Sequence, residues 1–362
     1  MKRNSHFLKF TWLVLGTLLA IGVSTPAGAD ITATDPFESA SLADPVPPAF
    51  GYVSSIAYYD GGLIYAGNDQ KIYTYDIESG ASTELWDLSA DLNFNFGPSG
   101  FMVSSDDYLY FHDNGKTDNI YRIDLTAPAA PNELDTGANG SIFTFTQNPY
   151  TDAIWFASAD FGPPNNMYLY QVTAGFGGVT QSGSGFAQPN VGGNGPIIFT
   201  EATTILYGES VFLGDGYFHL VNSDTGNILT PNYLTFVGGL AAAVYGYDDM
   251  IFVTTGNGKQ IFRLEGDSKT AIASTTDAAQ GIVWGGNPLF VSEMTDMGDV
   301  SFSSLERVDT SSKKKGGGGS GGCFIGTAIN GTMCYQQLVI CGVAFAAMLL
   351  AGFCHGRLRR KE

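Results

Sequence analysis

The sequence has 362 residues, of which 44% are hydrophobic, 13% aromatic and 14% charged, and its formal net charge is −18. Residues 30–312 contain seven Lys and Arg against thirty-four Asp and Glu, so this part of the chain carries a net charge of about −27. Nucleic-acid binding requires a basic surface, and such a partner is therefore excluded.

Residues 1–29 have the pattern of a secretory signal peptide. Three cations near the start precede an almost wholly apolar stretch, residues 10–23. Ala27 and Ala29 are small residues at the positions that precede a cleavage site, so we expect a mature chain that begins at Asp30. The alternative is a retained membrane anchor.

The chain from residue 50 to residue 310 is organised around the unit Leu63–Gly80. This unit holds two short runs of β-branched and aromatic residues separated by a Gly-Asn-Asp turn, which predicts a β-hairpin. Both runs recur in step along the chain at intervals of 45, 45, 52, 45 and 38 residues. The six copies of the first run are centred on Ile64, Leu109, Ile154, Leu206, Ile251 and Leu289.

A further apolar run precedes each hairpin and a weaker one follows it, so each unit holds up to four strands within roughly 40–50 residues. This period is typical of a propeller blade, and we predict an all-β, six-bladed β-propeller of four-stranded blades. Two alternatives stay open, a two-sheet sandwich array and an irregular seventh blade around residues 175–195.

The sixth unit stops at Asp309 without a fourth strand. Residues 30–49 are acidic and proline-rich, and they form either a solvated leader or a strand that closes the ring. Because a propeller ring closes best when one terminus supplies the missing strand, we predict that residues 30–40 or 45–52 complete the last blade.

The chain after residue 310 changes in character. Residues 311–322 are rich in Lys and Gly and predict a flexible linker, and residues 323–332 begin with a short signature. Residues 333–354 are apolar enough and long enough for a transmembrane helix, and residues 355–362 are basic. The cations there, which include Arg357, Arg359 and Arg360, place this end in the cytoplasm by the positive-inside rule.

The order of linker, signature, apolar span and basic end resembles the tripartite C-terminal sorting signals of bacterial surface proteins. The signature Cys323-Phe324-Ile325-Gly326-Thr327-Ala328 is similar to the CFI-box, usually written CFIATA, from which it departs at Gly326. This resemblance covers about 40 residues and implies export, anchoring and processing near Cys323. The alternative is a plain membrane anchor behind a flexible linker.

All four cysteines lie in this tail, so the exported region has no disulfide and no thiol chemistry. The exported region also has only two histidines, His112 and His219, and a structural role is expected for each. His112 occupies the same position in its unit as Glu209 does two units later. With no paired acid and base in view, no catalytic residue is assigned.

Calcium is the metal that an acidic region of this kind would hold, because carboxylate and carbonyl oxygens are its usual ligands. Two short oxygen-rich loops are candidates, and turn residues alone also explain them. The candidate ligands are Asp113, Asn114 and Asp118 in one loop and Asp296 and Asp299 in the other.

Residues 72–86 resemble the blade repeat of quinoprotein propellers, with Asp76, a Ser-Gly turn and Trp86. Asn222–Gly226 repeats the turn without the tryptophan, and the other units lack it. No quinone cofactor is inferred from this match.

Three functional hypotheses remain. The leading one is an exported, membrane-anchored propeller that binds a protein, a glycan or a small ligand at the bacterial cell envelope. The second is an extracytoplasmic propeller enzyme, a lyase, lactonase or dehydrogenase, that uses carboxylates around the channel and calcium. The third is a structural surface protein.

Overall fold

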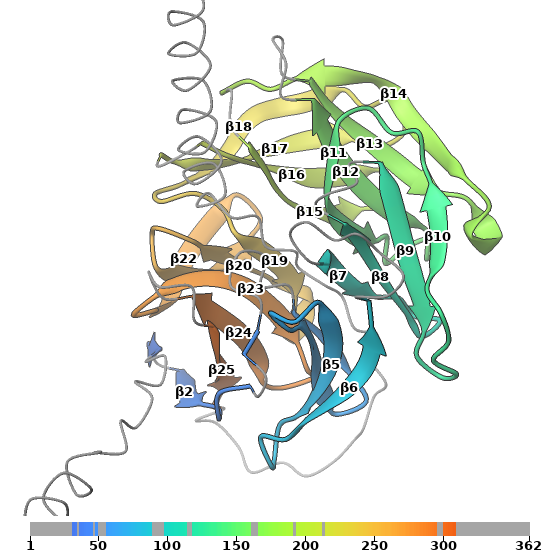
Figure 1. Ribbon diagram of the computed structural model, residues 1–362. Coiled ribbons are helices and arrows are strands. Elements are labelled where there is room, and N and C mark those ends of the chain that lie inside the picture. Colours follow the sequence, from blue (N-terminus) through green and yellow to red (C-terminus); the bar gives the residue numbers. More distant parts are fainter. Residues whose placement is uncertain are drawn as a thin grey trace, which may run out of the picture.

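The computed structural model describes residues 31–308 apart from 35, 46–47, 50–55, 89–97, 114–117, 161–165, 191–192, 212–213 and 295–299. In this part the chain forms six antiparallel sheets around a central axis (Figure 1). Each sheet is a blade of four strands, and one sheet gains a fifth. The predicted all-β, six-bladed propeller of four-stranded blades is therefore confirmed, and the sandwich alternative is wrong.

Each blade is a meander whose first strand lies nearest the axis (Figure 1). The first two blades consist of β3 (Ile56–Tyr59), β4 (Gly62–Ala66), β5 (Lys71–Asp76), β6 (Ser82–Asp87), and β7 (Pro98–Val103), β8 (Tyr108–Asp113), β9 (Asn119–Asp124), β10 (Asn132–Asp135). The next two consist of β11 (Ser141–Gln147), β12 (Ile154–Asp160), β13 (Asn166–Val172), β14 (Val179–Ala187), and β15 (Gly193–Glu201), β16 (Thr204–Ser210), β17 (Gly216–Asn222), β18 (Ile228–Phe236). The last two contain β19 (Ala242–Tyr245), β20 (Ile251–Thr255), β21 (Gln260–Glu265), β22 (Ser268–Ser274), and β23 (Ala278–Trp284), β24 (Leu289–Met294), β25 (Val300–Arg307).

Two short 3-10 helices, η2 (Ala174–Phe176) and η3 (Tyr247–Asp249), lie in loops on the same face of the propeller. We name this face, which carries the turns from first to second and from third to fourth strand of each blade, the lower face. The upper face carries the remaining turns.

Successive side chains of a strand point to opposite faces of its sheet, so each blade presents side chains to both neighbouring blades. Aromatic rings fill the space between the blades. The largest fully buried side chains are all Tyr and Phe. Phe156 stacks on Tyr170 at 5.0 Å between centroids, and Phe111 stacks on Tyr121 at 5.4 Å. Most of the aromatic residues that recur in the sequence units are thus core residues.

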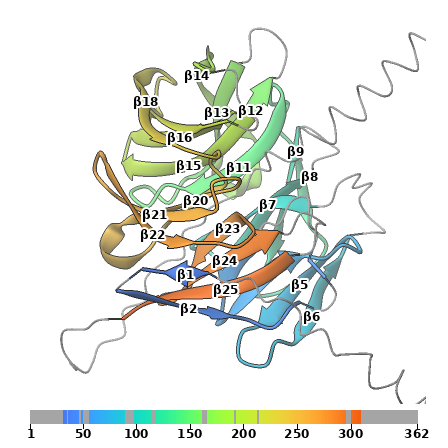
Figure 2. The same cartoon turned by 90° about the vertical axis from the view of Figure 1, so that its left-hand side faces the viewer.

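The ring is closed by the N-terminal segment, as predicted. Strand β2 (Phe37–Ser41) pairs antiparallel with β25 and becomes the fourth strand of the last blade (Figure 2). Phe37 is buried and lies edge-on to Tyr247 and Phe252 of the fifth blade, at 6.1 and 6.2 Å between ring centroids. The preceding strand β1 (Thr32–Ala33) adds a fifth strand to the outer edge of the fifth blade, which the sequence did not indicate.

The stretch around residues 175–195 forms no seventh blade. It supplies β14, the outer strand of the third blade, and the start of β15. Gly183 and Gly185 have φ of +62° and +80°, and β14 pairs with β13 across a register shift at this point. Glycine tolerates that backbone at low cost, so a Gly-rich segment that suggested a loop instead continues as a bulged strand.

The predicted signal peptide with its cleavage site at Ala27, Ala29 and Asp30 lies outside the described residues. The same holds for everything after Val308, including the linker, the Cys323 signature and the apolar span. In the part of the chain that is described, no helix is long and apolar enough to cross a membrane.

Candidate functional site

Acidic residues lie at or near the C-terminal ends of the second strands in alternate blades. Leu109, Ile205 and Leu289 take equivalent places in β8, β16 and β24, because they pair with Ile123, Val221 and Leu305 of the adjacent strands. Four residues further along lie Asp113, Glu209 and Glu293, all at most 1% exposed. These acids lie at the upper ends of their strands, each on the same side of its strand as a buried apolar residue two positions earlier, namely Phe111, Tyr207 and Val291.

This register corrects one prediction. Glu209 is equivalent to Asp113, and the residue of β16 that corresponds to His112 is Gly208. The predicted alignment was one residue off, because Leu206 was taken as the counterpart of Leu109. Both residues at that point of the fourth unit are apolar and fully buried, so the sequence pattern does not separate them.

Glu209 and His219 form a buried network in the fourth blade. The Nδ1 atom of His219 accepts a hydrogen bond from the Asn232 N–H at 2.9 Å, so the neutral ring carries its proton on Nε2 and donates it to Glu209 Oε2 at 2.9 Å. The N–H and the Nδ2 of Asn190 also donate to this carboxylate, at 3.1 and 3.0 Å. Both ring nitrogens are engaged, so this network ties the loop before β15 to the blade.

His112 is enclosed between the second and third blades. Its Nε2 lies 3.0 Å from Ser99 Oγ and 3.3 Å from the carbonyl oxygen of Phe143. A Cβ at Gly100, where φ is +69°, would lie 2.7 Å from the ring, so only glycine fits there. Burial lowers the pKa of His112 from 6.5 to about 4, which keeps the imidazole neutral near pH 7.

The predicted calcium ligands do not assemble into a site within the described ranges. Asp113 is buried at the end of β8, whereas Asp118 is partly exposed and its carbonyl accepts from Thr136. Asn114, Asp296 and Asp299 lie outside the described residues. Among the residues that are described, no three His, Cys, Asp or Glu side chains are arranged to hold a metal ion.

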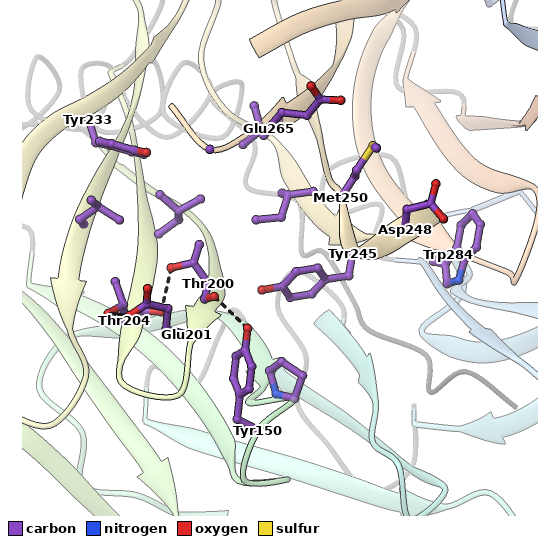
Figure 3. A pocket seen from close by; sticks show the side chains of 17 residues that line it. Tyr150, Thr200, Glu201, Thr204, Tyr233, Tyr245, Asp248, Met250, Glu265 and Trp284 are labelled. Atoms are coloured by element: carbon purple, nitrogen blue, oxygen red, sulfur yellow. Dashed lines mark hydrogen bonds between the residues drawn. The ribbon is translucent and has the colours of Figure 1, made fainter. Parts of the chain in front are cut away.

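The lower face carries a groove of about 990 Å³ between the fourth and fifth blades, which we name the blade 4–5 groove (Figure 3). Its walls are apolar. Leu206 and Leu220 of the fourth blade lie on one side, and Ile251 and Leu264 of the fifth blade lie on the other. These residues belong to the core between the two blades, so the groove is the unfilled lower end of that core.

Aromatic side chains from four blades surround the opening. The ring of Tyr245 extends into the middle of the groove, between Tyr150 on one side and Met250 on the other (Figure 3). Tyr150, whose hydroxyl donates to the Thr200 carbonyl at 2.8 Å, is 56% exposed. Tyr233 and Trp284 lie at opposite ends of the view (Figure 3). Exposed aromatic surface over an apolar floor is typical of ligand sites.

The groove is open because the turn between the third and fourth strands of the fifth blade is short. In the third blade the turn from third to fourth strand spans 173–178 and carries Phe176 on η2, which fills the gap to the second blade and contacts Tyr110 at 5.9 Å. The corresponding turn of the fifth blade has only Gly266 and Asp267 between β21 and β22. It is too short to bring a side chain over the gap, so the blade 4–5 core stays uncovered. A smaller hollow of about 380 Å³ lies between the first two blades.

Neighbouring lower-face loops are joined by hydrogen bonds on both sides of the groove. Gln147 of the third blade bonds to the Ser105 N–H and Oγ of the second, and Asn148 donates to the Ala202 carbonyl of the fourth, at 2.9 Å. Tyr247 of the fifth blade donates to Asn287 of the sixth. These contacts hold the walls of the groove in place, so it is preformed.

Acidic residues form the rim of the groove. Glu201 lies on the fourth blade, and Asp248 and Glu265 lie on the fifth (Figure 3). Asp248 pairs with Arg307 at 2.9 Å and Glu265 pairs with Arg263 at 3.0 Å, whereas Glu201 accepts from the Thr204 hydroxyl at 3.3 Å. None of the described lining residues is itself a Lys or Arg. The groove therefore favours a ligand with apolar groups and positive charge.

None of the residues of this groove was predicted from the sequence to belong to a functional site. Tyr and Phe were assigned to the core, which is true of most of them. The signal that could have identified the groove is the difference between the six residues 173–178 and the two residues Gly266-Asp267 at equivalent turns.

The fold is shared with several solved structures at low identity. No protein-family model and no curated protein matches the chain. The PQQ-bound aldose sugar dehydrogenase of Streptomyces coelicolor is 14% identical, with 78% of this chain and 99% of that chain covered and a TM-score of 0.54. A Bacteroides thetaiotaomicron protein of unknown function is 12% identical, with 76% and 77% covered and a TM-score of 0.55.

A virginiamycin B lyase of Staphylococcus aureus, solved with quinupristin, is 14% identical, with 75% of this chain and 100% of that chain covered and a TM-score of 0.49. At such identities the similarities to the sugar dehydrogenase and to the Bacteroides protein show a shared fold alone, and the similarity to the lyase carries no argument about this chain.

Proposed function

We propose that this chain is an exported, membrane-anchored binding module of the bacterial cell envelope, and that its ligand site is the blade 4–5 groove. The observation that carries the proposal is the combination of a preformed apolar floor, aromatic rings that are at least partly exposed and a rim of three acids in one opening. A ligand with an apolar or aromatic body and cationic groups, such as a basic peptide segment, matches all three.

The described residues give the enzyme hypothesis less support. His112 and His219 are both fully buried and hydrogen-bonded in the interior, away from the groove. Neither can exchange a proton with a ligand on the lower face. The carboxylates that end β8, β16 and β24 are equally buried.

A quinone cofactor such as the PQQ of the sugar dehydrogenase carries three carboxylates and needs cations around it. The described cations do not fit this requirement, because each is engaged on the outer parts of the blades. Their partners are Glu84 for Lys71, the rings of Tyr108 and Phe176 for Arg122, the Thr276 carbonyl for Lys259, Glu265 for Arg263, the Thr235 carbonyl for Lys269, and Asp248 for Arg307.

Binding can be tested with two water-soluble peptides with blocked ends, Lys-Leu-Trp-Lys and Glu-Leu-Trp-Glu, titrated into the full chain in nanodiscs of neutral lipid. We expect the cationic peptide to bind about tenfold more tightly than the anionic one, because exposed ion pairs contribute roughly 0.2–1 kcal/mol each. The difference should shrink at high salt. Saturation-transfer NMR, with empty nanodiscs subtracted, measures both affinities.

Substitutions separate the contribution of the acidic rim from that of the aromatic residues. Glu201→Gln combined with Glu265→Gln should weaken the cationic peptide and strengthen the anionic one, whereas Tyr233→Ala should weaken both alike. Asp224→Asn, an exposed acid on the same face outside the groove, should change neither. Equal affinity for the two peptides, or a response to Asp224→Asn as large as to the rim variants, would rule out this groove as the site.

The proposed location at the cell envelope is supported by the signal-like residues 1–29 and by the anchor-like residues 333–362 of the sequence. Mass spectrometry of the protein purified from the membrane fraction should give an N-terminus at Asp30, and protease added to spheroplasts should digest the propeller. An intact start at Met1 with the propeller protected inside the cell would contradict both export and orientation.

A further inference from the structure

The chain leaves the propeller beside the groove. Strand β25 ends at Arg307 on the lower face, and the Arg307 guanidinium pairs with Asp248, one of the three rim acids, at 2.9 Å. The N–H of Arg307 also donates to the hydroxyl of Tyr247 at 2.9 Å, and that of Val308 donates to the Pro36 carbonyl. The last described residue is therefore fixed next to the rim.

The next cations along the chain are Lys313, Lys314 and Lys315, which lie outside the described residues. Lys313 is the fifth residue after Val308, so its Cα atom can lie at most about 17 Å from that of Val308. Glycines follow from Gly316. Three consecutive lysines are thus tethered on a short chain beside an acidic rim, whose described cations are Arg263 and Arg307, the partners of Glu265 and Asp248.

We infer that the segment Ser311–Lys315 is the resident occupant of the blade 4–5 groove, with lysine ammonium groups at Glu201 and Glu265 and lysine stems along the apolar walls. Lysine stems cover apolar surface while their charged ends stay in water, so a segment without large apolar side chains can still shield this floor. The occupant regulates entry of the ligand, and in that respect the inference rests on the proposed function.

Tethering sets the strength of this competition. A short flexible connection holds the lysines at an effective concentration in the millimolar range. The apparent affinity of a peptide in solution should fall by about fivefold when the lysines bind the rim with a dissociation constant roughly four times lower than this effective concentration. A ligand that adds an aromatic side chain, which the lysine segment lacks, would displace it.

The test is carbodiimide cross-linking of the full chain, which joins an amine to a carboxylate only where the two are in contact, followed by peptide mass spectrometry. We expect intramolecular links from Lys313, Lys314 or Lys315 to Glu201 and Glu265. These links should be lost in the Glu201→Gln, Glu265→Gln variant. Links spread evenly over exposed acids such as Asp224 and Glu38, or no links at all, would overturn the inference. Mixing labelled and unlabelled protein identifies links made by a second copy, which would also overturn it.

Peptide binding to a variant with all three lysines replaced by glutamine separates the two proposals. About fivefold tighter binding of the Lys-Leu-Trp-Lys peptide to that variant supports both. Unchanged binding, without the cross-links, removes the inference and leaves the binding function in place. Rim-specific cross-links, with no binding of the peptide to either protein, support the resident segment and remove the proposed ligand class.

Discussion

Replacing Phe37 by alanine is expected to lower the free energy of unfolding by about 3–5 kcal/mol, the cost typical of removing a buried phenylalanine. Phe37 is the buried side chain of β2 and contacts Tyr247 and Phe252 across the junction between the fifth and last blades. Its loss leaves a cavity at the point where the ring is closed, so β2 should also detach from β25 more readily. Urea unfolding followed by circular dichroism measures the stability change.

The neighbouring Glu38 provides the control, because it lies on the same strand with its side chain exposed. It pairs directly with Glu306 across the sheet, so Glu38→Ala should be neutral or slightly stabilising. Hydrogen exchange of the β25 amides should accelerate in Phe37→Ala only. If both variants unfold at the wild-type midpoint, closure of the ring does not depend on β2.

The fold could be predicted because its information is local and repeated. Each hairpin is predicted by its own apolar runs and turn residues. Six copies of this pattern in step along the chain indicate a repeated structural unit. The closing strand was predicted for a different reason, namely that the last unit lacked a strand and a ring has to close. Strand β1 was missed because two residues, Thr32 and Ala33, show no alternation, and their position is set only by pairing with β22.

The predicted number of six blades is confirmed, and the alternative of an irregular seventh blade around residues 175–195 falls within the long step of 52 residues between Ile154 and Leu206. The extra length lies between these two residues, where β14 and β15 each have nine residues. Strand length and bulges vary between blades without changing their number. A pattern that measures spacing alone cannot distinguish a long outer strand with glycines at positive φ from an added irregular blade.

The groove could not be predicted from its own residues. Tyr150, Tyr233, Tyr245 and Trp284 come from four blades, and most of the other aromatic residues in the described chain belong to the core. What distinguishes them is the absence of a covering side chain between two blades, which depends on the short turn at Gly266. A sequence pattern shows which residues are present. A groove that exists because a turn is too short to cover the core is indicated only by the length of that turn.

The buried polar residues show a similar limit. Asp113, Glu209 and Glu293 are carboxylates of the kind that the enzyme hypothesis required around the central channel. The strand register instead places their side chains in the space between blades. A shift of one residue reverses the direction of a side chain in a strand, so a prediction that is correct to within one residue can still place an acid on the wrong side.

His112 should make the stability of the protein depend on pH. Its pKa is about 4 in the folded state and 6.5 ordinarily, because the buried ring resists protonation. Between these values the unfolded chain binds a proton that the folded chain does not, so the free energy of unfolding falls as the pH decreases. The contribution is fully present above pH 6.5 and is lost as the pH falls toward 4. Between pH 7.5 and 4.5 this should amount to about 2–3 kcal/mol.

The measurement is urea unfolding of the wild type and of His112→Gln at several pH values across this range. Glutamine lacks the titration but keeps a donor and an acceptor near Ser99 and the Phe143 carbonyl, so the variant should be less stable at pH 7.5 and lose less stability on acidification. Carboxylates that titrate in the same range contribute equally to both proteins, and the difference between the two slopes isolates His112. Parallel pH profiles would mean that the folded protein admits the proton, and that the ring is not sealed between the second and third blades.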